Sequence, residues 1–293
     1  FDKFYENFCK FMKLDINIIS FLKTRYRKLK SLLSKANRSI IHITNTFPSF
    51  SPNSWGSYKL RSNLTILSIN QTIPALNLFV NNKDKNNLFR NDFEKKIQVS
   101  TPFKKKLGEL FEYYGSDKSV THDYHKLYGE ILSNFDSIEK IFEIGLGTNN
   151  LDVVSSMGRK GKPGASLRAF RDACNSAQII GADFDKRILF SEERINCFFV
   201  DQTDLNTFNQ LTDKIGDNYD LMIDDGLHAP NANLHSLKFF LNKIKIGGYA
   251  VIEDIGIKSK EIWRLTSALL PSNFNGALIK TKLAYVYVVK RIS

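Results

Sequence analysis

Residues 140–149 constrain the fold more than any other part of this 293-residue chain. An apolar run that ends at Glu143 and Ile144 is typical of a buried parallel strand. Gly145 and Gly147 follow it, separated by one residue. Because glycine has no Cβ, the chain can turn sharply there and a ligand can approach the backbone closely. The segment therefore predicts a strand that ends in a nucleotide-binding loop.

Beyond this loop, apolar runs alternate with amphipathic segments, which predicts a doubly wound α/β fold with a parallel sheet. The last two runs are too close together for a helical crossover, so we expect them to pair antiparallel. Before the loop, a helix is predicted that ends at Gly115. The result is a seven-stranded, mainly parallel, Rossmann-like sheet. Its predicted strands are residues 140–144, 178–182, 197–200, 220–223, 248–252, 277–280 and 284–289, and the predicted helix is residues 104–114.

Polar residues follow the second and third predicted strands. In a doubly wound sheet, ligands bind at the carboxyl ends of the strands, where an acid can accept hydrogen bonds from ribose hydroxyls. Asp183 lies at this position, with Asp185 as a nearby competitor. Asp201 and Gln202 end the third strand, where a carboxylate and an amide can bind an adenine amino group. We expect a nucleoside pocket here, with ordinary turns and caps as the alternative.

Four acids follow the fourth and fifth predicted strands: Asp224, Asp225, Glu253 and Asp254. Adjacent parallel strands lie about 4.8 Å apart, so these carboxylates share a small volume. They repel one another unless a cation neutralises them, and oxygen ligands favour Mg²⁺ or another hard divalent cation over zinc. The alternative is that Asp224 or Asp225 caps a helix that begins near Pro230.

His228 lies three residues after Asp225, within reach of a molecule bound beside such a cation. An imidazole can take a proton from a hydroxyl near neutral pH, particularly when a cation has made that hydroxyl more acidic. We interpret His228 as a general base. An ordinary surface histidine is the alternative.

Six short motifs occur together in this part of the chain. They are Tyr114-Gly115-Ser116-Asp117-Lys118 with His122, Tyr124 and Tyr128; Glu143-Ile144-Gly145-Leu146-Gly147; Gly164-Ala165-Ser166-Leu167-Arg168; Gly181-Ala182-Asp183; Asp224-Asp225 with His228; and Glu253-Asp254. Their combination resembles the metal-dependent class I O-methyltransferases that use S-adenosylmethionine, typified by the macrocin and mycinamicin enzymes of natural-product biosynthesis. The resemblance covers residues from about 107 to the end of the chain.

The resemblance implies that Asp225, Glu253 and Asp254 bind magnesium and that His228 removes a proton from the acceptor. The implied reaction moves a methyl group to a hydroxyl of a saccharide or glycosylated metabolite. The parts of the S-adenosylmethionine donor are also assigned. Ribose is assigned to Asp183, adenine to Asp201 and Gln202, the methionyl part to the loop of Glu143, Gly145 and Gly147, and its carboxylate to Ser116 and Lys118.

Other functions remain open. Relatives of the cephalosporin hydroxylase type share this fold and acid set, and a non-catalytic cofactor-binding module would also keep the pocket. We do not expect a nucleic-acid partner, because the basic excess lies mainly in the first 40 residues and no Asn-Pro-Pro-Tyr-like segment is present for a flipped base. A small-molecule or glycan hydroxyl is therefore the expected acceptor.

We divide the chain into a basic amphipathic helical arm (1–36), an irregular extension (37–100) and a methyltransferase domain (101–293). Residues 1–40 hold ten Lys and Arg against three acids, which gives +7 of the net charge of +12. The arm is either a solvated face or a peripheral contact with anionic lipid or nucleic acid, and the extension is a candidate contact for a homo-oligomer. Within the extension we predict strands at 40–44, 63–69 and 76–80 and a linker at 81–87.

Cys9, Cys174 and Cys197 have unrelated spacings, which indicates a reducing, cytoplasmic compartment. No apolar run approaches the roughly 20 residues that span a bilayer. The chain begins at Phe1, as a processed product or a fragment would. Residues 149–163 contain the basic run Arg159-Lys160-Gly161-Lys162, which either folds over an anionic acceptor or is disordered.

Overall fold

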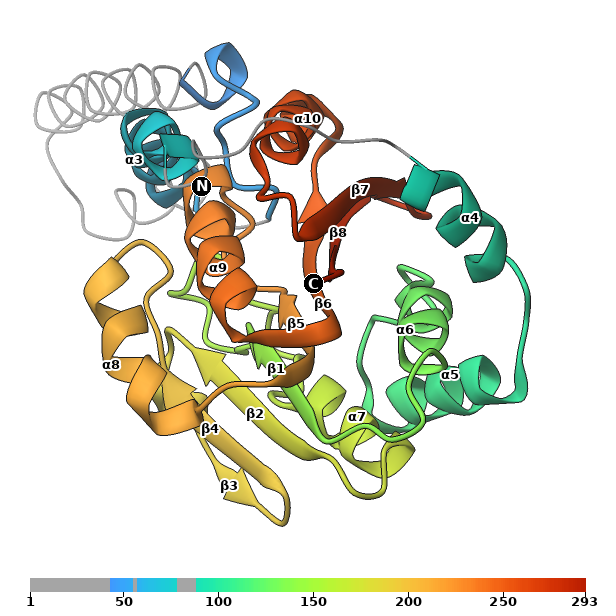
Figure 1. Ribbon diagram of the computed structural model, residues 1–293. Helices are drawn as coiled ribbons and strands as arrows, with labels where there is room; N and C mark the ends of the chain where they lie inside the picture. Colours follow the sequence, from blue (N-terminus) through green and yellow to red (C-terminus); the bar gives the residue numbers. More distant parts are fainter. Residues whose placement is uncertain (1–42, 55–56, 78–87) are drawn as a thin grey trace, which may run out of the picture.

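The computed structural model describes residues 43–54, 57–77 and 88–293, which build a mixed sheet with helices on both faces (Figure 1). The strand order is β3-β4-β2-β1-β5-β6-β8-β7. The predicted α/β class is confirmed, with one strand more than expected: the two-residue β3, which pairs antiparallel with β4. The strands are β1 (Lys140–Ile144), β2 (Gln178–Asp183), β3 (Ser191–Glu192), β4 (Ile195–Phe199), β5 (Tyr219–Asp224), β6 (Ile244–Ile255), β7 (Phe274–Lys280) and β8 (Tyr285–Arg291).

The five strands β4, β2, β1, β5 and β6 are parallel. β8 runs antiparallel to both β6 and β7, so the predicted antiparallel pairing of the last two strands is confirmed. The chain moves outward from β1 through β2 to β4 and then returns to β5 on the other side of β1. This reversal creates a switch point at the carboxyl ends of β1 and β5, which is where ligands bind in such sheets.

Two helical layers cover the sheet (Figure 1). Neighbouring residues of a strand face opposite layers: Phe142 packs with the α9 layer and Ile141 with the α5 layer. Because both faces are buried, these strands are continuous apolar runs in the sequence. One layer contains α4 (Leu88–Ile97), α5 (Pro102–Tyr114), α6 (Tyr124–Leu132) and α7 (Ala165–Ala173); the other contains α3 (Tyr58–Asn77), α8 (Leu205–Ile215), α9 (Pro230–Lys243) and α10 (Lys260–Leu269).

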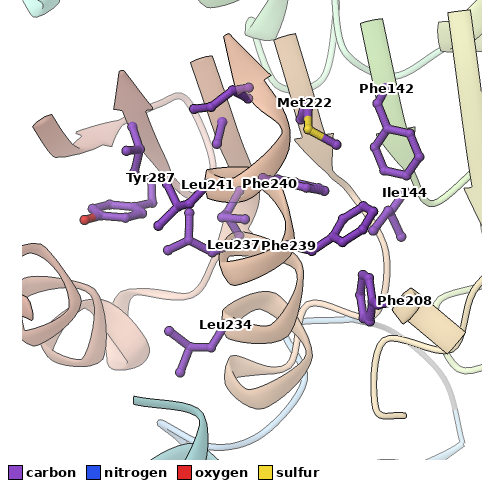
Figure 2. Packing of buried hydrophobic residues seen from close by; sticks show 14 of the residues in the cluster. Phe142, Ile144, Phe208, Met222, Leu234, Leu237, Phe239, Phe240, Leu241 and Tyr287 are labelled. Carbon is purple, nitrogen blue, oxygen red and sulfur yellow. The ribbon is translucent and has the colours of Figure 1, made fainter. Parts of the chain in front are cut away.

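The α9 layer shows how this packing fixes the site. Phe239 and Phe240 of α9 lie beside the sheet residues Phe142 and Ile144 in Figure 2. The rings of Phe142 and Phe240 meet edge to face, with centroids 5.8 Å apart. Burial of each such side chain contributes about 1.5–3 kcal/mol. The end of β5 and the start of α9 are therefore held firmly, and the segment that carries the predicted base lies between them.

Helix α3 corrects the prediction for the extension: the strand expected at 63–69 is wrong. The short apolar run there resembles a strand, but Thr65, Ser68 and Thr72 are buried and recur at intervals of three and four. This spacing places them on one helical face, and α3 packs against α9. The Thr72 hydroxyl donates to the Ser68 carbonyl within the helix (2.6 Å). The buried stripe is polar, so a search for apolar periodicity misses it.

Most of the remaining N-terminal predictions concern residues outside the described part of the chain. The arm (1–36) and the linker (81–87) lie outside the described residues, as does most of the strands expected at 40–44 and 76–80. Residues 43–46 are helical, not extended. The helix predicted at 104–114 is confirmed and ends, as expected, at Gly115. Among the described helices, none has the length and apolar character needed to cross a membrane.

Candidate active site

The glycine loop after β1 runs directly beside the end of β5. Gly145 and Gly147 have φ angles of 92° and 78°, which glycine adopts without strain. A Cβ at Gly145 would lie 2.0 Å from the carbonyl oxygen of Asp225, so a side chain has no room there. The Gly145 amide donates to Ala182 (2.9 Å), and the Asp225 amide donates to Ile144 (2.8 Å). The loop therefore joins β1, β2 and β5 at the switch point.

Asp183 and Asp185 hold this loop from the end of β2. Asp183 accepts hydrogen bonds from the Leu146 and Asp185 amides, both at 2.7 Å. Burial raises the pKa of the Asp183 carboxyl, although these amide donors oppose the shift. Asp185 accepts from the Thr148 hydroxyl (2.6 Å), and the Arg187 guanidinium lowers the pKa of Asp185. Both acids therefore stabilise the loop, so Asp183 and its competitor Asp185 share this structural role.

A cavity of about 310 Å³ opens at the carboxyl ends of β1, β2, β4 and β5. Four predicted cofactor residues line it: Gly145, Asp183, Asp201 and Gln202. A mostly apolar cavity with a few polar groups suits a small organic ligand. We call it the donor cavity. Its apolar wall includes Val153, Phe184 and Val200. Leu60 and Leu64 of α3 also line it, a position that was not predicted.

Gln202 is engaged with the protein itself. Its side-chain nitrogen donates to Asp224 and Ser236, both at 2.8 Å, and its side-chain oxygen accepts from the Leu227 amide (2.8 Å). These bonds hold the turn after β5, which favours a structural role over the predicted contact with adenine. The N-cap of α9 is Ala229, with no side-chain cap bond, so the acids after β5 do not cap this helix.

The ammonium group of Lys118 lies within the predicted acid cluster. Its Nζ is 2.6 Å from Asp225, 2.6 Å from Glu253 and 3.2 Å from Glu143. Burial works to lower the pKa of Lys118, but these three carboxylates outweigh it and hold the pKa well above its ordinary value. Because an ammonium group has three N–H donors, all of them can be used by carboxylates. The predicted contact between Lys118 and a methionine carboxylate stays a prediction, because Lys118 also lines a small recess beside Ser116.

Two tyrosines of α6 bind the acids that follow β6. Tyr128 donates to Glu253, and Tyr124 donates to Asp254 (2.5 Å). Burial raises the pKa of Glu253 well above its ordinary value, as do neighbouring carboxylates, while Lys118 opposes the shift. Both carboxylate oxygens of Glu253 therefore already have protein partners. Its role as a metal ligand stays a prediction. Glu253 does not belong to the group of possible metal ligands that Asp225, His228 and Asp254 form.

Asp225, His228 and Asp254 bring metal-ligating atoms within 4.8 Å of one another. His228 Nε2 is 3.7 Å from Asp225 Oδ1 and 3.9 Å from Asp254 Oδ2. His228 and Asp254 have left-handed φ angles of 55° and 53°, a strain of about 1–3 kcal/mol each that is concentrated at functional sites. Carboxylate oxygens suit Mg²⁺, and an imidazole nitrogen suits transition metals. The two carboxylates fit a hard divalent cation, and the His228 imidazole lies beside them.

A second cavity, of about 850 Å³, adjoins the first, and Ser155 lines both. His228 and Asp254 form part of its wall, so we call it the acceptor cavity. Asn53 fixes this wall: its amide donates to the His228 carbonyl (3.0 Å), and its side chain donates to the Asp254 carbonyl (2.6 Å). This role of Asn53 was not predicted. Residues 155–158 also line the cavity, so the middle of the predicted loop 149–163 is folded against it, and the basic run 159–162 is not part of this wall.

No protein-family model matches the chain. Two curated proteins of Streptomyces olivaceus are similar to it. The 8-demethyl-8-alpha-L-rhamnosyl tetracenomycin-C 2'-O-methyltransferase is 27% identical over 143 residues, which cover 48% of this chain and 35% of that protein. The predicted resemblance to sugar O-methyltransferases is confirmed. The 8-demethyl-8-(2-methoxy-alpha-L-rhamnosyl)-tetracenomycin-C 3'-O-methyltransferase is 25% identical over 162 residues, covering 54% of this chain and 39% of that protein. The chain thus spans well under half the length of these relatives.

Solved structures also resemble the chain. The MycE methyltransferase of the mycinamycin pathway, in complex with Mg, SAH and mycinamycin VI, has a TM-score of 0.48 and 20% identity, over 64% of this chain and 54% of MycE. The O-methyltransferase TomG from Streptomyces achromogenes, in complex with SAM, has a TM-score of 0.42 and 13% identity, over 69% and 95%. The α/β fold of this chain is established by its own strand order, not by these similarities.

Proposed function

We propose that this chain transfers a methyl group from S-adenosylmethionine to a hydroxyl of a saccharide or glycosylated metabolite. The observation that carries the proposal is the pair of adjoining cavities, one beside the glycine loop and one beside His228 and Asp254. They offer neighbouring places for a nucleoside donor and a hydroxyl acceptor. The similarity to two enzymes named for methylation of a rhamnosyl group supports a sugar as acceptor.

The donor cavity is assigned to the adenosyl part of the donor. When bound, S-adenosylmethionine supplies a methyl group on a positively charged sulfur. Asp183 and Asp201 offer carboxylate oxygens to hydroxyl and amino groups, and a carboxylate can accept more hydrogen bonds than the protein uses here. A recess of about 30 Å³ lined by Ser116, Gly145 and Gly147 is assigned to the methionyl part.

Asp225 and Asp254 would hold Mg²⁺ or another hard divalent cation, whose charge makes a nearby hydroxyl more acidic. Lys118 occupies one oxygen of Asp225 and leaves the other on the side of His228. We assign His228 as the base: its Nε2 accepts the proton of the acceptor hydroxyl while the oxygen bonds to the methyl carbon and the carbon–sulfur bond breaks. Cavity walls that orient both partners supply the remaining catalysis.

Release of S-adenosylhomocysteine tests the proposal, with rhamnosides and other glycosides as acceptors. Removal of a general base lowers kcat about 100- to 10,000-fold, so we expect His228→Gln to lose activity to this extent without losing donor binding. His125→Gln is the matched control, because His125 lies against Gly108 rather than in either cavity. We expect this variant to keep wild-type activity.

Several outcomes would contradict parts of the proposal. Methyl transfer that survives both a chelator and Asp254→Asn would reject the role of the cation. Donor binding without S-adenosylhomocysteine release from any acceptor would favour a non-catalytic module. Oxygen-dependent conversion of the acceptor without release would favour an activity of the hydroxylase type.

A further inference from the structure

Arg61, near the start of α3, lines the acceptor cavity without a carboxylate partner among the described residues. Its guanidinium has five N–H donors. One nitrogen donates to the Pro52 carbonyl at a long 3.3 Å, and Nε is buried without any hydrogen bond. A buried donor that stays unsatisfied is costly, particularly when it is charged. The Nη1 nitrogen also makes no hydrogen bond among the described residues, so the guanidinium has donors left for a ligand that binds from the cavity.

The helix fixes the direction of this side chain. Leu60 and Leu64, four residues apart on one face of α3, line the donor cavity, whereas Arg61 lines the acceptor cavity. The Thr65 hydroxyl donates to the Arg61 carbonyl (2.7 Å). Asn231 of α9 also donates to a side chain of α3, Gln71, at 2.7 Å. Helix α3 thus borders both cavities and presents Arg61 to the acceptor side.

Ser54 adds a second unsatisfied group to this wall, since its hydroxyl is buried without a hydrogen bond and it also lines the acceptor cavity. The acids of the cavity are arranged differently. His122 lies 3.4 Å from Asp117 and 3.5 Å from Asp254, so both acids have a basic neighbour. Among the described residues of this wall, Arg61 is a cation whose N–H donors are not used by an acid, so they can bind a ligand.

We propose that Arg61 and Ser54 bind an oxyanion of the acceptor, which would make the acceptor an acidic saccharide with a carboxylate or phosphate group. A guanidinium binds either group through two parallel N–H···O bonds, and a serine hydroxyl can add a third. Arg61 is a positioning residue in this arrangement and takes no part in methyl transfer. The inference rests on the proposed function only for the assignment of the cavity to the acceptor.

Calorimetry of the whole chain, saturated with S-adenosylhomocysteine, tests this inference. The probes are D-glucuronate, D-glucose 6-phosphate and the neutral methyl glucoside. We expect one acidic probe to bind about tenfold more tightly than the neutral one, and its identity distinguishes a carboxylate from a phosphate. Arg61→Gln should weaken that probe about 10- to 100-fold and leave the neutral probe unchanged.

Lys59→Gln is the matched control, because it removes the same charge from an exposed position two residues away on α3. We expect its affinities to stay within about twofold of wild type. Arg61→Lys, which keeps the charge, should retain a preference for the acidic probe, so the test stays decisive if thermal unfolding shows that Arg61→Gln is misfolded.

Three results would overturn the inference: no preference of the wild type for an acidic probe, an unchanged preference in a folded Arg61→Gln, or a loss confined to S-adenosylhomocysteine binding. The last result would assign Arg61 to the donor. Because the binding measurement needs no turnover, it is independent of a failure to detect methyl transfer, which would refute only the proposed function.

Discussion

Lys118→Met removes the cation from between two buried carboxylates, those of Glu143 and Glu253, and the partly exposed carboxylate of Asp225. The Lys118 side chain is 2% exposed and lies within 3.2 Å of oxygens of Glu143, Asp225 and Glu253. Methionine preserves much of the apolar stem but leaves the acids facing one another. Removal of one partner from a buried ion pair costs about 3–5 kcal/mol, and a typical domain is stable by about 5–15 kcal/mol. We therefore expect a loss of about 3–5 kcal/mol in the free energy of unfolding.

The loss should depend on pH, with a sign set by the carboxyl pKa values. Burial raises the pKa of Glu143, Asp225 and Glu253, and the Lys118 charge opposes each shift. Without Lys118, these pKa values rise further. A carboxyl whose pKa is raised in the folded state stabilises the fold below its unfolded pKa, and this stability is lost as pH rises through the folded pKa. The cost of Lys118→Met should therefore be greatest near about pH 8 and smaller near about pH 5.

Urea unfolding followed by circular dichroism measures this loss, with Lys243→Met as the control. Lys243 is also buried, but its partner Asp217 is 62% exposed and can be solvated by water after the substitution. We expect the control to cost about 0–1 kcal/mol. Equal losses in the two variants, or a loss for Lys118→Met that does not change with pH, would show that the Lys118 charge does not stabilise the carboxylate cluster.

Three further predictions concern the two cavities and the loop. Leu64→Trp should fill part of the donor cavity and weaken S-adenosylhomocysteine binding about tenfold or more by calorimetry, whereas Ile66→Trp, at an exposed position of the same helix, should not. The pKa of Asp185 is lowered in the folded chain, so its carboxylate should stabilise the fold by about 1 kcal/mol above about pH 4, and this stabilisation should fade as pH falls. In urea unfolding, Asp185→Asn should therefore lose more free energy of unfolding at about pH 7 than at about pH 3. Mg²⁺ should raise the Tm of the wild type and of the exposed control Asp152→Asn, but not that of Asp254→Asn. An equal rise in all three proteins would mean that the cation binds away from Asp254.

Local signals in the sequence were sufficient for the sheet and the glycine loop. The apolar strands and the positions of Gly145 and Gly147 reflect local backbone requirements, which a short segment reveals. The partners of Lys118 could not be predicted, because its bonds to Asp225 and Glu253 join positions 107 and 135 residues apart. The role of α3 was missed because most of its buried side chains carry hydroxyl groups, and their burial depends on packing against α9.

The most direct test of two adjoining sites is a crystal structure of the chain with S-adenosylhomocysteine and Mg²⁺. We expect the adenosyl group in the donor cavity beside Asp201, and a cation between Asp225 and Asp254 at the wall of the acceptor cavity. A nucleoside bound outside the donor cavity, or a cation coordinated away from both acids, would contradict the proposed arrangement of the two sites.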